Sequence, residues 1–364
     1  MKRLTVTLQK DTTQSYDIVI GYDIFDRIAE MIVHEQLASR YVIVSDDCVS
    51  PLYGKMLQSH LTSLDVKTEL IVFPAGENSK HIQSVLEICG KMLDCAVDRK
   101  SVLIALGGGV VGDLAGFVAS IYMRGISVMQ VPTTLMAQVD SSVGGKTAID
   151  LPQGKNLLGT FYQPASVFID IKCLNTLPME EYRNGLAEVV KYGIIDSEVF
   201  FKKLEGGVNH LLAKDRAFLE EVILVSCSIK KDIVEKDEKE SGLRRILNFG
   251  HTLGHAVEAA SEYTISHGRA VAIGMVGIAR LSNMIMDLPE GDAARIEKLI
   301  SSMGIDCRIP DEVFTADILT ALRRDKKKDG NTISFVLLRK IGSPVIKGDI
   351  PNGLLRDIIE GLRK

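Results

Sequence analysis

The feature that most constrains the fold is an apolar run that leads directly into a glycine-rich turn. Residues 101–106 read SVLIAL, and Gly107, Gly109 and Gly112 follow as G-x-G-x-x-G before a plausible helix. A short apolar run bounded by turn residues is typical of a strand buried in a parallel sheet. Such glycines let the backbone approach a pyrophosphate, and the helix N-terminus adds N–H donors. The stretch therefore predicts a parallel α/β sheet with a dinucleotide site, and a tight turn without a ligand is the alternative.

The rest of the N-terminal half repeats this alternation. Strand patterns occur at 4–8, 16–21, 41–46 and 128–132, and helical spacing occurs at 23–34 and 78–94. On the second helix we expect one apolar face made of Ile82, Val85, Leu86, Cys89, Met92 and Leu93. Strands that alternate with helices predict a parallel sheet covered by helices, as in a Rossmann-like domain.

After residue 175 the pattern becomes mainly helical. Helical spacing occurs at 178–192, 216–235, 248–261, 270–286 and 292–303, and a strand signal returns only at 332–338. A chain of 364 residues is long for one domain. We expect an α/β domain at 1–175 and a helical metal- and substrate-binding domain at 176–364.

The composition is that of a soluble globular protein, with 46% hydrophobic and 25% charged residues and a net charge of −4. This balance gives no bulk electrostatic case for nucleic acid. The most apolar window, 102–123, contains five glycines and Asp113, which argues against a membrane span. The polar N-terminus has no apolar signal core, and six scattered cysteines suit a reducing compartment. We therefore expect a cytoplasmic protein.

The segment 131–159 concentrates polar and glycine residues, and we expect it to form an irregular crevice wall. GGKT at 144–147 resembles the end of a phosphate loop, but Asp140 stands where that motif needs glycine. An ATPase or GTPase is therefore poorly supported, although Lys146 remains a candidate phosphate contact. The acid that usually follows a dinucleotide glycine turn by about 20 residues is missing. Asp46, after an earlier strand, is a candidate ribose contact instead.

A histidine cluster marks the second half. His251 and His255 are four residues apart and share a helix face, and His267 follows. Imidazoles at this spacing suit zinc with a carboxylate as third ligand, and histidines that cap local carbonyls are the alternative. Glu188 and Lys191 read either as an i,i+3 ion pair or as a metal ligand beside a cationic substrate contact.

Two charge runs, 230–240 and 323–330, read as solvated faces by default. Inward-facing candidates in or near these runs are Lys230, Arg244 and one of Lys326 and Lys327.

Several segments taken together resemble the 3-dehydroquinate synthase family of sugar phosphate cyclases. They are GGGVVGDLAGFVAS, QVPTTLMAQVDSSVGGKTAID, KNLLGTFYQP, GLAEVVKYG, RILNFGHTLGHAVE and HGRAVAIGM. The resemblance implies a lyase that depends on NAD and on zinc or cobalt. It would convert 3-deoxy-D-arabino-heptulosonate 7-phosphate to 3-dehydroquinate and phosphate, in the shikimate pathway. The steps would be transient oxidation by NAD, phosphate elimination, re-reduction and aldol closure.

The resemblance also implies roles for individual residues. The implied zinc ligands are Glu188, His251 and His267, so that His255 faces the substrate rather than the metal. The implied NAD contacts are Asp46, Glu77, Lys80, Gly108, Gly109, Val110, Asp113, Thr133, Thr134, Lys155 and Thr176. The implied substrate contacts are Arg124, Asp140, Lys146, Asn156, Lys191, Lys230, Arg244, Asn248, His255 and Lys327, the last favoured slightly over Lys326. Arg124 would reach the partner subunit's site, which implies a homodimer.

Three alternatives stay open. Another sugar phosphate cyclase, such as a 2-deoxy-scyllo-inosose or valiolone synthase, would share the fold, NAD and metal. A metal-dependent glycerol or alcohol dehydrogenase would accumulate NADH with the oxidised substrate. A non-catalytic binding protein would hold ligands without turnover.

Overall fold

The structure is a computed structural model that describes residues 1–6, 15–326, 333–348 and 350–363. It contains two compact units, of which the first comprises Met1–Leu177 and Leu219–Lys239, and the second comprises Pro178–Phe218 and Glu240–Lys364. From the sequence pattern we expected one domain for all of 176–364. The contacts within the structure instead assign Leu219–Lys239 to the first unit.

A seven-stranded sheet forms the centre of the first unit, in the order β1-β2-β9-β6-β5-β3-β4. The strands are β1 Lys2–Val6, β2 Tyr16–Gly21, β3 Tyr41–Asp46, β4 Thr68–Phe73, β5 Val102–Gly107, β6 Ser127–Pro132 and β9 Ser166–Asp170. β1 pairs antiparallel with β2, and all the other neighbours pair in parallel. The predicted parallel sheet is confirmed, and every residue of β5 is buried, as its apolar run predicts.

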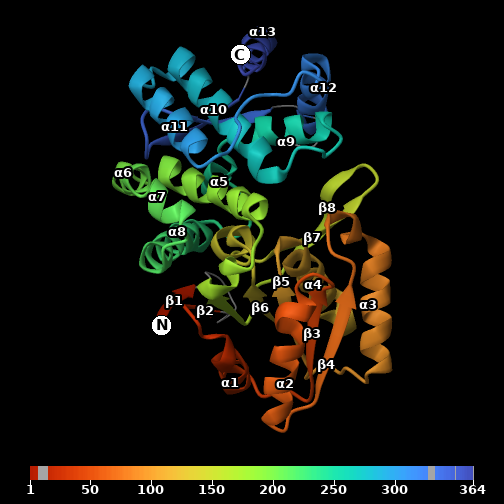
Figure 1. Cartoon of the computed structure of the whole chain (residues 1–364). Coiled ribbons are helices and arrows are strands. Elements are labelled where there is room, and N and C mark those ends of the chain that lie inside the picture. Colours follow the sequence, from red (N-terminus) through yellow and green to blue (C-terminus); the bar gives the residue numbers. More distant parts are fainter. Residues whose placement is uncertain (7–14, 327–332, 349, 364) are drawn as a thin grey trace. The chain divides into compact units, whose positions relative to one another are not determined.

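Helices cover both faces of this sheet (Figure 1). They are α1 Phe25–Glu35, α2 Lys55–Ser63, α3 Ile82–Asp94 and α4 Gly109–Ile121. Successive side chains of a strand point to opposite faces. On β3, Tyr41 and Ile43 therefore pack in the core with α1 and α2, while Val42 and Val44 pack in the core with α3 and α4.

The expected apolar face of α3 is partly wrong. Val85 and Met92 are buried as predicted, but Ile82, Leu86 and Leu93 are exposed. The buried stripe continues instead through Ile88. The helix also begins at Ile82 rather than at residue 78, because a separate 3₁₀ turn, Glu77–Ser79, precedes it.

The segment expected to be irregular contains a β-hairpin. A π-helical turn, Ala137–Ser141, leads to strands β7 Lys146–Leu151 and β8 Gly154–Phe161, which pair antiparallel. The register is interrupted between Ile149 and Leu151.

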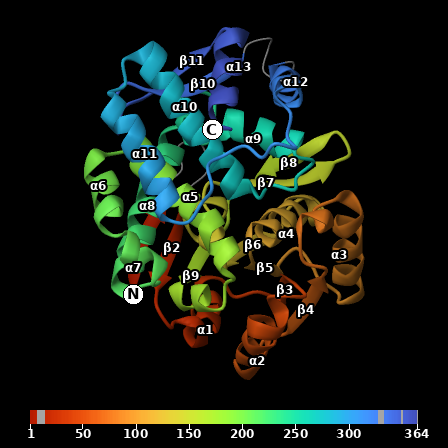
Figure 2. The ribbon, with the colours of Figure 1, turned by 45° about the horizontal axis from the view of Figure 1, so that its top comes forward.

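Helices make up most of the second unit, as predicted. They are α5 Met179–Ile195, α6 Glu198–Gly206, α7 Val208–Leu212, α9 His251–Ala260, α10 His267–Met286, α11 Glu290–Ser302, α12 Thr315–Lys326 and α13 Asn352–Gly361. α8, Arg216–Lys236, lies mostly in the first unit. Strands β10 Ser334–Leu338 and β11 Pro344–Gly348 pair antiparallel. α10 contacts α5, α9, α11, α13 and β10, which places it in the core of this unit (Figure 2).

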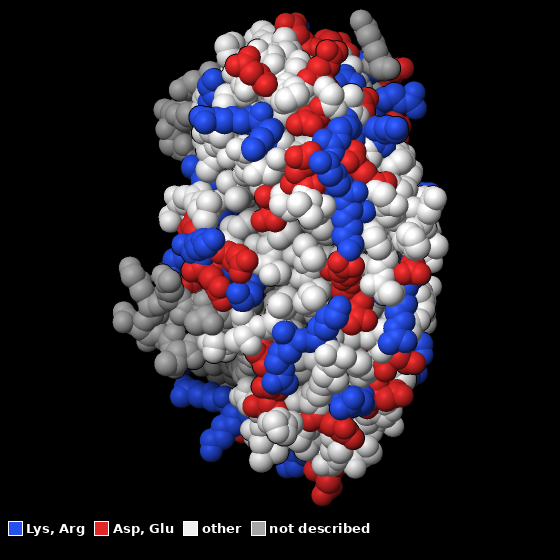
Figure 3. Space-filling view, turned by 90° about the vertical axis from the view of Figure 1, so that its left-hand side faces the viewer, with Lys and Arg blue, Asp and Glu red and all other residues white. Residues whose placement is uncertain are grey.

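Among the described residues, α10 is the one helix with the length and hydropathy of a membrane span, and 67% of its most apolar window is buried inside the structure. That burial is what the core helix of a folded unit shows. Acidic and basic side chains are interspersed on the face drawn in Figure 3. Ion pairs of the second unit include Lys202–Glu198 and Arg295–Glu205.

Candidate active site

The carboxyl ends of β3 and β5 form one candidate ligand edge in the first unit. These strands are parallel neighbours, and Val44 pairs with Ala105. Two residues further on, Asp46 and Gly107 end their strands at the same edge of the sheet. The chain leaves β3 towards β4 and leaves β5 towards β6, in opposite directions along the sheet. Ligands of open α/β sheets bind where strand order reverses in this way.

The glycine turn joins β5 to α4 as predicted. Gly108 precedes the first turn of α4, which begins at Gly109. A Cβ atom at Gly108 would lie 3.0 Å from Cγ2 of Thr134, and one at Gly112 would lie 2.9 Å from Oε1 of Gln130. Glycine at these positions lets the turn and the helix pack closely, and the N-terminus of such a helix supplies N–H donors suited to a phosphate-bearing ligand.

Asp46 and Thr176, two of the predicted NAD contacts, have partners of their own. Oδ1 of Asp46 accepts the backbone N–H groups of Cys48 and Val49 at 2.9 and 2.7 Å. Burial raises the pKa of Asp46, and these two hydrogen bonds oppose that rise. Oγ1 of Thr176 lies 2.7 Å from the hydroxyl of Tyr53.

Lys80 is the centre of a polar cluster in the first unit. Its Nζ donates to Oδ2 of Asp113 and to Oδ1 of Asn156, both at 2.6 Å. Oε1 of Glu77 lies 3.8 Å from this Nζ and 4.0 Å from Nζ of Lys155. Desolvation lowers the pKa of Lys80, but the charges of Asp113 and Glu77 outweigh it and raise the pKa. The structure thus brings together five residues that the sequence selected separately.

Lys230 and Asp140 form another pair. Nζ of the buried Lys230, on α8, donates to the backbone oxygen and to Oδ1 of Asp140 at 2.6 and 2.8 Å. Lys146, at the start of β7, is exposed. Arg124 is also exposed and has a left-handed backbone with φ 73°, between Met123 at 48° and Gly125 at 116°.

The candidate metal centre lies in the second unit. Glu188, on α5, is 1% exposed, and its Oε1 lies 3.3 Å from Nε2 of His251 and 3.7 Å from Nε2 of His267. His251 begins α9 and His267 begins α10, so the ends of two helices bring both rings to one carboxylate. Burial alone raises the pKa of Glu188, but Lys191 and His251 outweigh it and hold the pKa well below its usual range.

Nδ1 of each imidazole, the nitrogen that faces away from Glu188, has a partner that fixes the orientation of the ring. Nδ1 of His267 lies 3.1 Å from Oε2 of the buried Glu258, and Nδ1 of His251 lies 3.2 Å from the backbone oxygen of Phe249. These acceptors place Nε2 of each ring on the side that faces Glu188. Burial lowers the pKa of His267, but the hydrogen bonds and charges of Glu188 and Glu258 outweigh it and raise the pKa to about 9. A metal at Nε2 would take the place of that proton, because a ligating imidazole is neutral. Metal-binding histidines generally have such second partners. Oε2 of Glu188 forms an ion pair with Lys191, while Oε1, which faces both Nε2 atoms, has no hydrogen bond of good geometry within the described residues. One carboxylate and two imidazoles are a donor set that fits a divalent cation.

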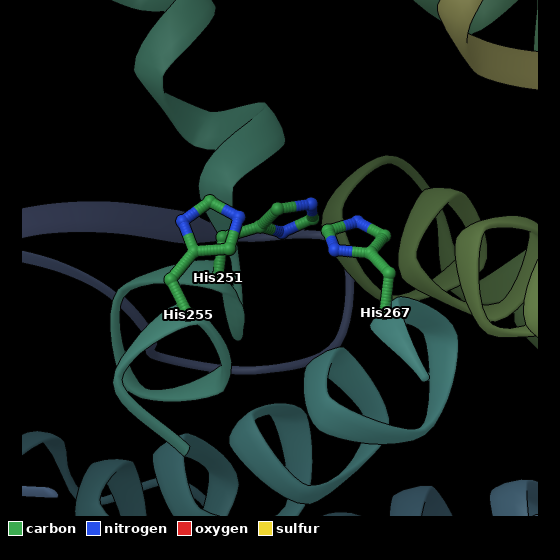
Figure 4. Close-up of side chains that lie close together, drawn as sticks. All are labelled: His251, His255 and His267. Carbon is green, nitrogen blue, oxygen red and sulfur yellow. The ribbon is translucent and has the colours of Figure 1, made fainter. Parts of the chain in front are cut away.

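His255 belongs to the same cluster (Figure 4). One ligand atom from each of His251, His255 and His267 lies within 4.8 Å of the others, and the three rings converge. Desolvation and the charges of the neighbouring imidazoles lower the pKa of His255, and since the residue is exposed at the surface the imidazoles are the firmer cause. Any lowering from the usual value favours the neutral ring at pH 7. The assignment of this ring to substrate rather than metal stays a prediction.

The remaining predicted residues of the second unit lie on α5 and on the 3₁₀ turn Leu243–Asn248. Lys191 is buried and forms an ion pair with Glu188. Arg244 is 1% exposed. Asn248 donates through Nδ2 to Oε1 of Glu240 at 2.8 Å. Lys327 lies outside the described residues, and nothing is described of the Lys326 side chain.

Three acidic residues that contact these groups were not predicted from the sequence. Glu258 stands in the quoted segment RILNFGHTLGHAVE, but its spacing from His267 gives no sign of the contact. Glu240 contacts Asn248. Asp150 accepts the backbone N–H of Asn156 at 2.7 Å.

The two units define a class of protein in which a Rossmann-like unit with a nucleotide-type glycine turn is joined to a helical unit that carries a candidate metal centre. Solved structures share this fold. The 2-epi-5-epi-valiolone synthase of Streptomyces hygroscopicus subsp. jinggangensis, solved with NAD⁺ and Zn²⁺ bound, is 28% identical with a TM-score of 0.89, and the match covers 98% of each chain. A 2-deoxy-scyllo-inosose synthase is 24% identical with a TM-score of 0.86, over 99% of this chain and 100% of that one.

The chain belongs to the 3-dehydroquinate synthase family. Residues 70–184 match the family model for the N-terminal part, and residues 185–328 match that for the C-terminal part. The 3-dehydroquinate synthase of Acidithiobacillus ferrooxidans is 47% identical over 319 residues, which is 87% of each chain. The family resemblance inferred from the sequence segments is therefore confirmed.

Proposed function

We propose that this protein is a 3-dehydroquinate synthase. It would convert 3-deoxy-D-arabino-heptulosonate 7-phosphate to 3-dehydroquinate and phosphate. Family membership supports the reaction. The observation that carries the mechanism is the cluster in which Nε2 of His251 and Nε2 of His267 lie beside the buried carboxylate of Glu188.

We propose NAD and a divalent metal, zinc or cobalt, as cofactors. When bound, NAD would supply reversible hydride transfer and the metal would polarise an oxygen of the substrate. Glu188, His251 and His267 would hold the metal, because one carboxylate and two imidazoles leave a position open for substrate. The glycine turn and the cluster around Lys80 would hold the nucleotide. The solved valiolone synthase with NAD⁺ and Zn²⁺ supports this pairing of cofactors.

The substrate carries a phosphate and a carboxylate, and the proposed contacts are mainly cationic or hydrogen-bond donors. From the first unit, Lys146 and Asn156 would bind phosphate oxygens through charge and N–H donors. From the second unit, Arg244 and Lys191 would offset substrate charge. The neutral ring of His255 would accept or return a proton at a ring nitrogen.

We further propose a cytoplasmic homodimer in which Arg124 serves the partner subunit's site. The left-handed backbone at Met123 and Arg124 supports a special role for this turn, because side chains rarely adopt that conformation. Light scattering measures the assembly. Mixing an Arg124→Ala chain with a Lys146→Ala chain tests the shared site, because one intact site of two would restore part of the activity.

The test of function is phosphate release from the heptulosonate phosphate. Release should need NAD and should stop after chelation and return with added divalent metal, without net accumulation of NADH. Glucose 6-phosphate is the matched control, since an inosose synthase would act on it. Release from glucose 6-phosphate alone, or NADH formed in proportion to substrate, would refute the proposal.

A further inference from the structure

The irregular point of the β7–β8 hairpin lies at Asp150. The ladder pairs Ile149 with Leu158 and Leu151 with Gly154. Asp150 therefore faces three residues of β8, 155–157, where a regular ladder would supply one. This bulge holds two of the predicted ligand contacts, Lys155 and Asn156. Asn156 adopts a left-handed backbone, with φ 54°.

Asp150 fills the gap in the ladder with its side chain and its backbone. Oδ1 of Asp150 accepts the backbone N–H of Asn156 at 2.7 Å. The backbone N–H of Asp150 donates to the backbone oxygen of Lys80 at 2.7 Å. Nζ of Lys80 in turn donates to Oδ1 of Asn156 at 2.6 Å. The three hydrogen bonds form a closed ring through Asp150, Lys80 and Asn156.

This ring fixes the direction of the Asn156 amide. An ammonium group only donates, so the atom that contacts Nζ of Lys80 must be the amide oxygen of Asn156. The amide nitrogen, with its two hydrogens, then lies on the other side of the group, where it can donate to an anion. A left-handed backbone at a residue other than glycine costs conformational energy, so it persists only where surrounding contacts stabilise it. The hydrogen bond to the carboxylate of Asp150 is such a contact.

We propose that Asp150 is a positioning residue that acts through Asn156 and holds its amide for the phosphate-bearing substrate. This role rests on the proposed function, in which Asn156 contacts the substrate. In this role Asp150 would act on the substrate only by orienting Asn156. The ring also joins the nucleotide contact Lys80 to the substrate contact Asn156 within the first unit.

The experiment is a double-mutant cycle. Asp150→Ala removes the acceptor for the Asn156 N–H, while Asp150→Asn retains an oxygen in the same place. Asn156→Gly removes the amide in a residue that tolerates the left-handed backbone. We expect Asp150→Ala to lower kcat/KM for the heptulosonate phosphate roughly 10- to 100-fold, the effect of one hydrogen bond to a charged group. Asp150→Asn should recover most of this loss.

In the Asn156→Gly background, Asp150→Ala should cause no further loss. A purely structural role would instead lower kcat/KM by the same factor in both backgrounds, and that result would overturn the proposal. Unchanged kcat/KM in Asp150→Ala would also overturn it.

A second readout does not depend on turnover. The backbone N–H of Asn156 should exchange its hydrogen faster in Asp150→Ala than in the unchanged protein, because its acceptor is gone. In Asp150→Asn the exchange rate should be close to that of the unchanged protein. Equal exchange in all three proteins would refute the positioning role. Failure of the proposed function would look different. The unchanged protein would then release no phosphate, while exchange at the Asn156 backbone N–H would still differ between the three proteins as expected.

Discussion

Glu258 offers a sharp test of the candidate metal centre, because it contacts a proposed ligand without being one. Its Oε2 lies 3.1 Å from Nδ1 of His267, and its side chain is almost fully buried. Glu258→Gln keeps the shape and an acceptor oxygen but removes the charge. It leaves Glu188, His251 and His267 unchanged.

The expected loss follows from the change in hydrogen-bond type. A hydrogen bond to a charged group contributes about 1.5–3 kcal/mol and a neutral one about 0.5–1.5 kcal/mol. The difference of roughly 1–1.5 kcal/mol corresponds to about a tenfold weaker affinity for metal. Because His267 is partly exposed, with 34% of its side-chain surface accessible, solvent reduces the effect. Removing the partner of a metal-binding histidine usually lowers metal affinity roughly 10- to 100-fold, and we expect a loss at the low end of that range.

The assay is competition for zinc or cobalt with a chromophoric chelator, which reads metal affinity independently of turnover. Glu262→Gln is the matched control, since it removes the same charge from an exposed side chain four residues further on. Far-ultraviolet circular dichroism checks that each variant is folded. Equal affinities for Glu258→Gln and the unchanged protein would refute the positioning of His267. An equal loss in Glu262→Gln would show a general charge effect instead.

Four further substitutions test other parts of the structure. Glu188→Gln should lower the metal content measured by atomic absorption, because it removes the shared carboxylate; full occupancy would exclude Glu188 as a ligand. Lys146→Ala should raise KM for the phosphate-bearing substrate without changing thermal stability, since the side chain is exposed; an unchanged KM would remove it from the site. Gly274→Ala should destabilise the protein by at least about 1–3 kcal/mol in urea unfolding, because the added Cβ would lie 2.0 Å from the backbone oxygen of Gly250; a neutral result would show that α9 and α10 can separate. Asp170→Ala should lower the free energy of unfolding by about 3 kcal/mol or more, because the buried carboxylate accepts three backbone N–H groups near the start of α1. These hydrogen bonds measure 2.8–2.9 Å. A loss below about 1 kcal/mol would mean that other acceptors replace the carboxylate.

The strand before the glycine turn was predictable because a buried parallel strand is apolar along its whole length. SVLIAL has that pattern, and β5 and α4 lie where it placed them. The β7–β8 hairpin was not predicted, because its glycines and charged residues conceal the alternation of a strand. The apolar face of α3 was misassigned because residues three and four apart define two overlapping stripes, and only tertiary packing selects the one with Ile88.

In the candidate site, too, some residues could be predicted from local sequence spacing and others could not. Helical spacing pointed to His251 and His255, and the structure does place both rings together with His267. Glu188 is 63 residues before His251 in the chain, so no local pattern connects them. The resemblance to a family supplied that connection, and the distances within the second unit agree with it.

The path of the chain between the units has a practical consequence. Residues Leu219–Lys239 return to the first unit after the second has begun, so the chain passes between the units three times. A fragment that stops at Leu177 would lose the buried Cys227, whose Sγ donates to the backbone oxygen of Gln138, and would leave Asp140 without Lys230. A gene cut at Leu177, or at residue 184 where the first family match ends, would therefore yield an incomplete first unit with exposed apolar surface that is prone to aggregate. Complementation with two separately expressed halves needs a split that keeps this returning helix with its sheet.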